Sequence, residues 1–293
     1  MDVAQALLEV GGIADVGVLL TVCSRHQLTA AVAAGAVVRL SRGRFALPGM
    51  DEDRVAAASL SGALWGLSAA RHWGWKVKSP PARSQVLVPR GRNVLASRRA
   101  GIDLRWGEVS PCELADGVTS KEHTALDCAR LLTFDAGLAV VDSALRDGVS
   151  RTTLLLGCAD LPRTGRSNAY RVVELASPLA ANPFESVVRA VLEDVPGARF
   201  QPQVWVGNTG RADLVDRVHR IVVECDSFEF HSDAASLNRD MERYNSFVCA
   251  EHVVLRFGWR HAMFEQDYVR ATVAAVITAQ ERSGRVCKHG RPA

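Results

Sequence analysis

The sequence lacks several features that would restrict where and how the protein acts. Its seven cysteines are odd in number, widely scattered and without a Cys-x-x-Cys pair, so neither a disulfide framework nor a thiolate zinc site is expected. No apolar run approaches the roughly 20 residues that span a bilayer, and the amino terminus has no basic stretch leading into an apolar core. No long-period repeat or low-complexity tract is visible. These absences predict a cytoplasmic protein with no membrane partner.

The amino-acid composition of the chain is ordinary, but its arginines are unevenly distributed along the sequence. Its 293 residues suffice for two or three domains, and 48% hydrophobic and 23% charged residues are typical of a folded protein. The net charge of +3 says little about partners, whereas local arginine clusters suit a polyanion such as DNA. The two clusters are Arg39, Arg42 and Arg44, and Arg90, Arg92, Arg98, Arg99 and Arg105.

Residues 1–50 have the order of elements typical of a winged helix-turn-helix domain. Two short helices, the second capped by Asp15, precede a third helix that opens at the capping-box pattern Ser24-Arg-His-Gln27. Strands are expected at 37–40 and 45–47. In such a domain the third helix enters the major groove and the hairpin contacts phosphates. The alternative is a protein-contact module whose arginines are merely solvated. The predicted DNA contacts are Arg25, His26, Gln27 and Thr29 on the helix and Arg42 and Arg44 on the hairpin.

Residues 51–176 are predicted to form an α+β unit without a cluster of titratable groups. Apolar spacing indicates helices near 56–65 and 120–148 around two strands. His72 and His123 are isolated in sequence, and each is expected to be a surface or a satisfied core histidine. The arginine-rich connection between the strands supplies further predicted DNA contacts, Arg90, Arg92, Arg98 and Arg99.

A third predicted domain, residues 177–293, contains the acidic residues that suggest chemistry. Two apolar strands joined by a tight polar turn carry Asp213 on the first strand and Glu224 and Asp226 on the second. Because strand side chains alternate, Glu224 and Asp226 share a face, and pairing of the two strands brings Asp213 beside them. Two such charges about 4 Å apart repel by roughly 4 kcal/mol at an effective dielectric near 20.

A hard divalent cation would remove this repulsion, because carboxylates and water are the ligands that Mg²⁺ prefers. The sequence therefore predicts an Mg²⁺ or Mn²⁺ site with Asp213, Glu224 and Asp226 as ligands. The alternative is a partly exposed strand face whose acids pair with arginines such as Arg239 and Arg243.

Further helices and a strand are expected to flank these acids. Pro183 begins a predicted helix whose apolar face excludes Glu185, so this side chain can stabilise the helix dipole or reach the neighbouring site. A strand at 252–257 and a closing helix from 264 to about 282 complete the domain. A helix is also expected at 236–249, after the acidic strands and before the strand at 252–257. Its buried face is predicted to consist of Leu237, Met241, Tyr244 and Val248.

This order of elements resembles the PD-(D/E)xK nuclease superfamily, and most of all its DUF559 or very-short-patch-repair (Vsr)-like branch. The resemblance covers about residues 180–280 and implies a restriction-endonuclease-like mixed sheet flanked by helices. Ser227 stands where the branch usually has Gly, and Asp226 stands where many superfamily members have a lysine. The matching pieces are Val223-Glu-Cys-Asp-Ser-Phe-Glu-Phe-His231, the helix with Asp240 and Arg243, and Val254-Leu-Arg256.

The resemblance also implies roles for individual residues. Asp213 and Glu224 would bind the cation, Asp226 would be a ligand or a neighbour of one, and Glu185 would complete the acidic set. His231, with an ordinary pKa of about 6.5, would orient or deprotonate water. The side chains expected to hold the acids or contact the scissile phosphate are Arg243 and Arg256.

Residues 1–160 resemble, more loosely, the AbiEi-type antitoxin or regulator module. The matching pieces are Ser61-Gly-Ala-Leu-Trp-Gly66, Leu87-Val-Pro-Arg90 and Thr124-Ala-Leu-Asp127. A cognate toxin or a DNA-modifying partner is thereby implied, and the sequence does not indicate an oligomeric state.

Taken together, these patterns predict a mixed α/β protein that is an Mg²⁺-dependent DNA endonuclease with a DNA-binding front module. The competing hypothesis is an AbiEi-like antitoxin or transcriptional regulator whose nuclease-like domain is catalytically silent. A third is a purely structural or protein-interaction role.

Overall fold

The computed structural model describes residues 2–207, 210–226 and 234–284, and within them the protein is a mixed α/β fold with three small sheets. The chain divides into two compact units, which are described separately. Unit 1 comprises Met1–Gly74 and Ser79–Asp127, and unit 2 comprises Trp75–Lys78 and Cys128–Ala293. The division into three domains at residues 50 and 176 stays a prediction.

Unit 1 begins with three helices and a three-stranded antiparallel sheet in the order β1-β3-β2. The predicted capping box is confirmed, because the Ser24 hydroxyl accepts from the Gln27 N–H and the Gln27 side chain accepts from the Ser24 N–H. Asp15 does not cap the second helix but pairs with Arg44 across 2.9 Å, and strand β1 was not predicted. The elements are α1 (Val3–Glu9), β1 (Ile13–Asp15), α2 (Val16–Leu19), α3 (Arg25–Ala33), β2 (Val38–Ser41) and β3 (Arg44–Ala46).

The rest of unit 1 surrounds a second sheet in the order β4-β5-β6. Strands β5 and β6 are parallel and β4 is antiparallel to β5. Its core consists of small and branched apolar side chains such as Leu60, Val86 and Val88. The elements are α4 (Glu52–Leu60), β4 (Ala63–Leu64), α5 (Gly66–His72), β5 (Ser84–Pro89), the 3-10 turn η1 (Ala96–Arg98), β6 (Ile102–Gly107), α6 (Pro111–Asp116) and the part of α7 (Lys121–Leu131) up to Asp127.

In unit 2, α8 (Phe134–Arg146), α9 (Arg151–Asp160) and α10 (Arg166–Leu175) precede α11 (Pro183–Leu192). Helices α9 and α10 were not predicted from the sequence. A buried ion pair joins α8 to α11, in which the Arg189 guanidinium contacts the Asp142 carboxylate at 2.7 Å. The Ser177 N–H also donates to Asp142 at 2.6 Å. These contacts fix the helix that carries Glu185.

A four-stranded mixed sheet in the order β10-β9-β8-β7 forms the centre of unit 2. Strand β8 (Gly210–Asp216) is antiparallel to both β7 (Phe200–Val206) and β9 (Ile221–Asp226), and β10 (Val253–Gly258) runs parallel to β9. The remaining helices are α12 (Ala234–Cys249), α13 (Trp259–Phe264) and α14 (Gln266–Arg282). The closing helix predicted from 264 to about 282 corresponds to α14, and the short helix α13 before it was not predicted.

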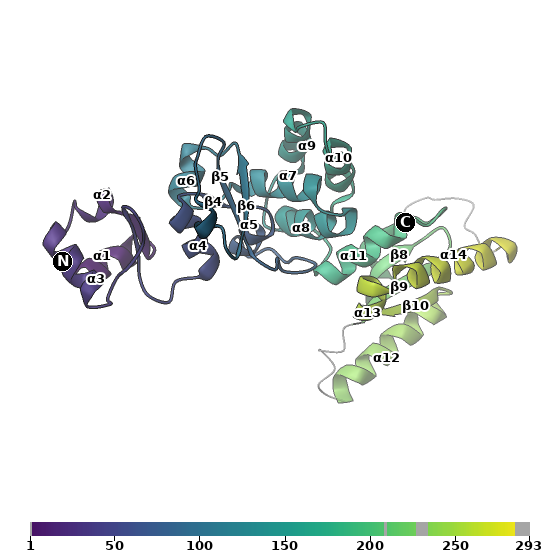
Figure 1. The fold of residues 1–293 in the computed structure, drawn as a ribbon. Helices are drawn as coiled ribbons and strands as arrows, with labels where there is room; N and C mark the ends of the chain where they lie inside the picture. The colour runs from purple at the N-terminus through teal and green to yellow at the C-terminus, as the bar shows by residue number, and fades with distance from the viewer. Residues whose placement is uncertain (1, 208–209, 227–233, 285–293) are drawn as a thin grey trace. The chain divides into compact units, whose positions relative to one another are not determined.

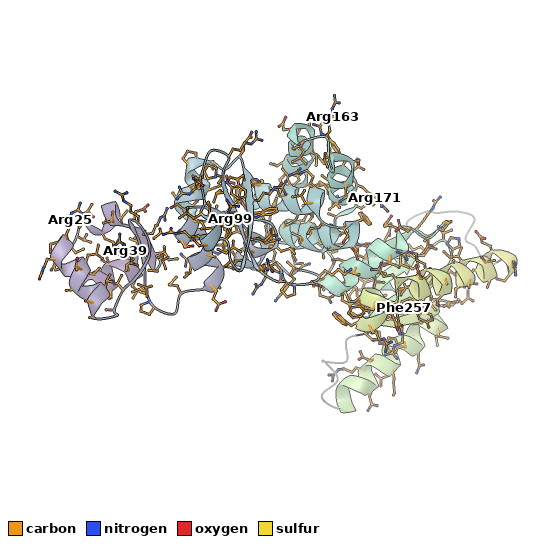
Figure 2. All side chains as sticks on the ribbon, in the orientation of Figure 1. Arg25, Arg39, Arg99, Arg163, Arg171 and Phe257 are labelled. Atoms are coloured by element: carbon orange, nitrogen blue, oxygen red, sulfur yellow. The ribbon has the colours of Figure 1, made fainter. Side chains whose placement is uncertain are left out.

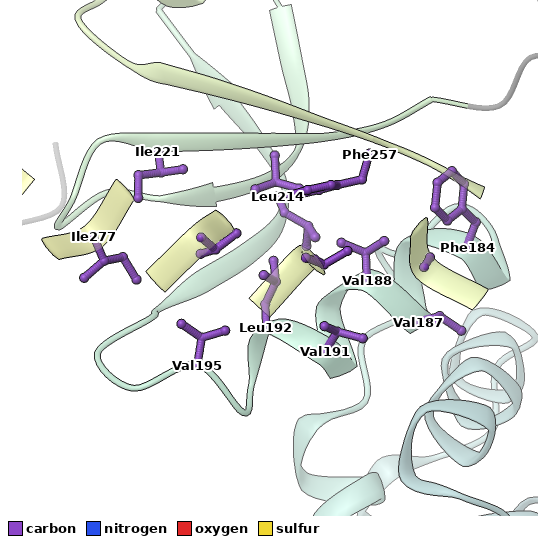
Figure 3. Close-up of a cluster of buried hydrophobic side chains, with 14 residues drawn as sticks. Phe184, Val187, Val188, Val191, Leu192, Val195, Leu214, Ile221, Phe257 and Ile277 are labelled. Carbon is purple, nitrogen blue, oxygen red and sulfur yellow. The ribbon is translucent and has the colours of Figure 1, made fainter. Parts of the chain in front are cut away.

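Both faces of this sheet are covered. On one face, α11 and α14 pack against the strands through Val188, Leu192 and Ile277, which lie below Leu214 and Ile221 in Figure 3. The other face packs against α12 of the same unit (Figure 1). The carboxyl end of β9, with its acidic residues, therefore lies between two helical layers.

Helix α12 turns a different face to the sheet than predicted. Met241 and Val248 were expected inward but are 51% and 59% exposed, whereas Phe247 is fully buried. The reason is a close approach at Gly210, where an added Cβ would lie 2.8 Å from the Arg243 side chain. The helix thereby presents Arg243 and Phe247 to β8, and Tyr244 packs partly buried beside them. The side chain of Leu237 lies outside the described residues.

Two expectations about composition can be compared with the described residues. No helix among them is both long and apolar enough to cross a membrane. Their cysteines, which include buried Cys23, Cys128 and Cys158, are all free thiols.

Candidate acidic site and arginine-lined groove

The pairing of β8 with β9 brings Asp213 and Glu224 together. Their ladder ends at the pair Leu214↔Val223, so Asp213 and Glu224 occupy the next positions of the two strands. The Asp213 N–H donates to Glu224 Oε1 at 3.3 Å, and the Cys225 N–H donates to Asp213 Oδ2 at 2.9 Å. The convergence expected from the alternation of strand side chains is therefore present in the structure.

Glu185 joins these two acids through a residue that sequence reasoning missed. It lies in the first turn of α11, where Asn182 caps the helix, and its side chain is 4% exposed. The Gln203 amide donates from Nε2 to Glu185 Oε2 at 2.8 Å and to Asp213 Oδ1 at 3.1 Å. One amide thus bridges carboxylates from a helix and a strand. We name Glu185, Asp213 and Glu224 the acidic cluster.

Proton affinities in the acidic cluster show that its charge is not fully compensated. Burial and the neighbouring Asp213 raise the pKa of Glu185 to about 7 and the pKa of Glu224 to about 8. Burial likewise raises the pKa of Asp213, against the hydrogen bond from the Cys225 N–H and the Arg243 charge. Near neutral pH the cluster therefore shares protons, which is the behaviour of acids that lack enough positive charge nearby.

Arginines hold part of the acidic face. The Arg243 guanidinium lies 2.8 Å from Glu224 Oε2, and Arg256 lies 2.6 Å from Asp226 Oδ2. The Tyr244 hydroxyl donates to Asp226 Oδ1 at 3.0 Å, and Arg256 stacks over the Tyr244 ring. Both oxygens of the predicted ligand Asp226 are thus engaged by α12 and β10, although its charge still raises the pKa of Asp213 and of Glu224.

The donor set at this site suits a cation with few protein ligands. Across the described residues, no group of three or more His, Cys, Asp or Glu side chains is arranged to hold a metal ion. Mg²⁺, however, is commonly bound by one or two carboxylates, several waters and the phosphates of a substrate. Asp213 and Glu224 fit that pattern, because their carboxylates converge and their proton affinities are raised. The predicted catalytic histidine, His231, lies outside the described residues.

A second candidate site lies in the amino-terminal part of unit 1, between α3 and the β2–β3 hairpin. A groove of about 710 Å³ runs there, with an apolar floor that includes Leu28 and Phe45 and a rim of three arginines. Figure 2 labels two of the three, Arg25 on α3 and Arg39 on β2. We name this feature the arginine-lined groove. Its lining residues are Val16, Arg25, Leu28, Thr29, Val32, Ala33, Arg39, Arg42, Gly43 and Phe45.

The predicted DNA contacts of this region separate into two groups. Arg25, Thr29 and Arg42 line the groove, and neither Arg25 nor Arg42 forms an ion pair with another described residue. Arg44 pairs with Asp15 and is mostly buried, and Gln27 completes the helix cap. His26 is exposed on α3 without lining the groove. The groove also contains Arg39, which was noted only as part of an arginine cluster.

The arginines of the middle segment are likewise unequal. Arg99 donates twice to the Val94 carbonyl and stacks over Trp106, so it holds its own loop. Arg90 forms an exposed ion pair with Glu108 at 3.3 Å. Arg92 and Arg98 are exposed.

A third group of titratable side chains contradicts the expectation that this segment has none. His123 is not isolated, because its Nδ1 lies 2.8 Å from Glu113 Oε1 and its Nε2 lies 3.5 Å from Asp127 Oδ2. Burial lowers the pKa of His123, but hydrogen bonds to Asp127 and Glu113 outweigh it and raise the pKa overall. We name Glu113, His123 and Asp127 the histidine-centred cluster. Its signals in the sequence were the capping box Ser110-Pro-Cys-Glu113 and the i, i+4 spacing of His123 and Asp127.

Comparison with known proteins gives little further guidance. No protein-family model and no curated protein matches the chain. Among solved structures, the Rv2827c protein of Mycobacterium tuberculosis is similar over 64% of this chain and 78% of its own, with 14% identical residues and a TM-score of 0.39. A likeness at that level establishes neither a family nor a function, so the expected nuclease and antitoxin-module memberships stay predictions.

Proposed function

We propose that the protein is a divalent-metal-dependent deoxyribonuclease whose carboxyl-terminal part has a restriction-endonuclease-like fold and whose amino-terminal winged helix binds DNA. The observation that carries this proposal is the acidic cluster. Glu185, Asp213 and Glu224 come from α11, β8 and β9, converge without a compensating cation for each charge, and have raised pKa values. Such a cluster is costly to keep unless a cation or protons occupy it.

The residues would divide the work as follows. Asp213 and Glu224 would hold Mg²⁺ or Mn²⁺, which supplies neutralisation of phosphate charge and activation of water. Glu185, whose pKa of about 7 lets it take up or release a proton near neutrality, would exchange protons beside the site. Arg243 and Arg256 already lie against acids of this face and can turn their remaining N–H groups to a DNA phosphate.

The arginine-lined groove supports DNA binding by the amino-terminal part. Arg25 and Arg42 project from a helix and a hairpin with no acidic partner among the described residues, which suits contact with phosphates on both sides of a groove of DNA. Binding of this kind should weaken steeply with salt, because each neutralised phosphate releases counterions.

Activity measurements test the nuclease proposal. The full chain should nick or cut DNA in the presence of Mg²⁺ or Mn²⁺, and Asp213→Asn should lower the rate by at least about 100-fold, as expected when a positioned charge is lost from a catalytic centre. Asp194→Asn is the matched control, because Asp194 lies in an exposed ion pair with Arg171. Absence of cleavage by the wild type on duplex, mismatched, branched and single-stranded DNA with either cation would refute the proposal.

A second candidate function is a DNA-binding regulator with a silent nuclease-like domain. The ion pairs Arg243–Glu224 and Arg256–Asp226 favour it, because guanidinium groups already neutralise two of the acids. It predicts a gel shift that is lost in Arg25→Ala and Arg42→Ala and unchanged in Asp213→Asn, together with no cleavage and no heat of Mn²⁺ binding.

A further inference from the structure

Gln203 occupies an unusual position at the acidic cluster. The ladder between β7 and β8 pairs Pro202 with Leu214 and Val204 with Ala212, which sets Gln203 opposite Asp213. A primary amide has two N–H donors, and both find carboxylate acceptors here, Glu185 Oε2 at 2.8 Å and Asp213 Oδ1 at 3.1 Å. The side chain therefore spans the two elements that contribute acids, α11 and β8.

The backbone of Gln203 is also in a conformation that glutamine rarely adopts. Its φ is +55°, in the left-handed region, although it lies inside a strand. Glycine and asparagine enter this region more readily than other residues. Strained backbone of this kind persists where surrounding contacts determine it, and it gathers at functional sites. At Gln203 the surrounding contacts are the two hydrogen bonds to carboxylates.

We propose that Gln203 is the positioning residue of the acidic cluster, and that its amide, also bonded to Glu185, holds the Asp213 carboxylate in the orientation that binds a divalent cation together with Glu224. The inference rests on the proposed function, since it assigns the cluster a cation. Without the amide, two like charges on separate elements would move apart and the cation would lose a prepared site. Hydrogen-bond partners of metal ligands act in this way, and their loss typically weakens metal binding by about 10–100-fold.

Calorimetric titration of the full chain with Mn²⁺ tests this, using Gln203→Gly, Gln203→Asn and the control Gln201→Asn, because Gln201 is exposed on the same strand. Glycine fits the left-handed backbone and removes the amide. Asparagine also tolerates that backbone but is one methylene shorter, so it does not reach both carboxylates. Both variants at Gln203 should stay folded, as shown by a cooperative thermal transition, and bind Mn²⁺ about 10–100-fold more weakly. The control should match the wild type.

The outcomes separate the inference from the function on which it rests. Wild-type affinity in both folded Gln203 variants would overturn the positioning role and leave the cation site standing. Absence of Mn²⁺ binding by the wild type would overturn the proposed function and the positioning role together. A second readout is the Mn²⁺ concentration that half-saturates DNA cleavage. A positioning role predicts that this concentration rises in the variants while the rate at saturating Mn²⁺ recovers, and an unchanged half-saturating concentration contradicts it.

Discussion

Two clusters of partly buried titratable side chains, one in each unit, differ in how their charges are compensated. The histidine-centred cluster places an imidazole between Glu113 and Asp127. The acidic cluster places Asp213 between Glu185 and Glu224, with the Arg243 guanidinium 2.8 Å from Glu224 and the charge of Arg146 acting on Glu185. The first sets one histidine against two acids, whereas the second sets two guanidinium groups against three acids.

The difference shows that hydrogen bonds compensate a buried carboxylate less well when a like charge lies beside it. Glu185 accepts from the Ala181 N–H, the Asn182 amide and the Gln203 amide, yet burial and Asp213 raise its pKa to about 7. Burial also raises the pKa of Glu113, but the hydrogen bonds from Ser110, Ser120 and His123, together with the imidazole charge, outweigh burial and lower it overall. What distinguishes the two sites is the like charge of Asp213 beside Glu185, because every neighbour of Glu113 that shifts its pKa lowers it.

The largest effect is expected where a buried acid is fully paired. Asp142→Ala should lower the free energy of unfolding by about 3–5 kcal/mol, because it leaves the Arg189 guanidinium buried without its carboxylate. Urea denaturation of the full chain, followed by the fluorescence of tryptophan, measures this. Asp194→Ala is the control, since the Asp194–Arg171 pair is about half exposed and such pairs contribute about 0–1 kcal/mol. Equal losses in the two variants would mean that burial does not decide the strength of these pairs.

The acidic cluster should make the protein less stable as the pH rises. Glu185 and Glu224 have folded-state pKa values of about 7 and about 8, above their ordinary value of 4.5, so between these values the native state binds more protons than the unfolded state. Their contribution is complete below about pH 4.5 and is lost as the pH rises through 7 and 8. Glu224→Gln should reduce this loss by about 2 kcal/mol across the window, within the limit of about 1.4 kcal/mol per pH unit for one group.

Added Mn²⁺ sharpens the same measurement. A cation and protons compete for the same carboxylates, so the rise in thermal midpoint on adding Mn²⁺ should be larger near pH 8 than near pH 5 in the wild type and absent in Glu224→Gln. If the thermal midpoint of the wild type does not change between these pH values and does not respond to Mn²⁺, the charges of the acidic cluster are compensated as well as those of the histidine-centred cluster.

Removing the imidazole from the histidine-centred cluster should change the free energy of unfolding by a smaller amount. His123→Gln should lower the free energy of unfolding by about 1–2 kcal/mol below pH 6.5, where the imidazole is protonated, because Glu113 and Asp127 then lose the cation between them. The raised pKa of His123 means that its contribution is complete below the ordinary value of 6.5 and is lost as the pH rises through the folded-state value. The difference between wild type and variant in urea denaturation should therefore shrink at alkaline pH. A difference that grows with pH would contradict the assignment.

The sequence was informative where a short-range rule acts on neighbouring residues. The alternation of strand side chains and the tight turn predicted that Asp213 and Glu224 converge, and the first-turn position predicted that Glu185 can reach them. The capping box at Ser24 placed α3 correctly. Each of these depends on residues within one element or one hairpin, so no tertiary contact was needed to infer them.

It was uninformative where the side chain depends on a contact between distant elements. Gln203 follows Pro202 in a strand, and nothing in that pattern distinguishes a bridging amide in left-handed backbone from an ordinary edge residue. Glu113 and His123 lie ten positions apart and meet only because the chain reverses between α6 and α7. The prediction of which face of α12 packs against the sheet was wrong. Arg243 and Phe247 approach the backbone closely at Gly210, and the spacing of apolar residues within the helix contains no information about that contact.

The smallest effect is expected at Asp226, on the edge of the acidic face, and it decides how far the uncompensated region extends. Arg256 is about half exposed where it meets Asp226, so Arg256→Ala should change the free energy of unfolding by less than about 1 kcal/mol. DNA cleavage should fall further than stability if Arg256 turns to a phosphate. A loss well above 1 kcal/mol that grows with pH would mean that Arg256 also offsets the charge that Asp226 exerts on Asp213 and Glu224. Four carboxylates would then share the charge of three guanidinium groups, and the cation site would have a third ligand available once Arg256 moves away.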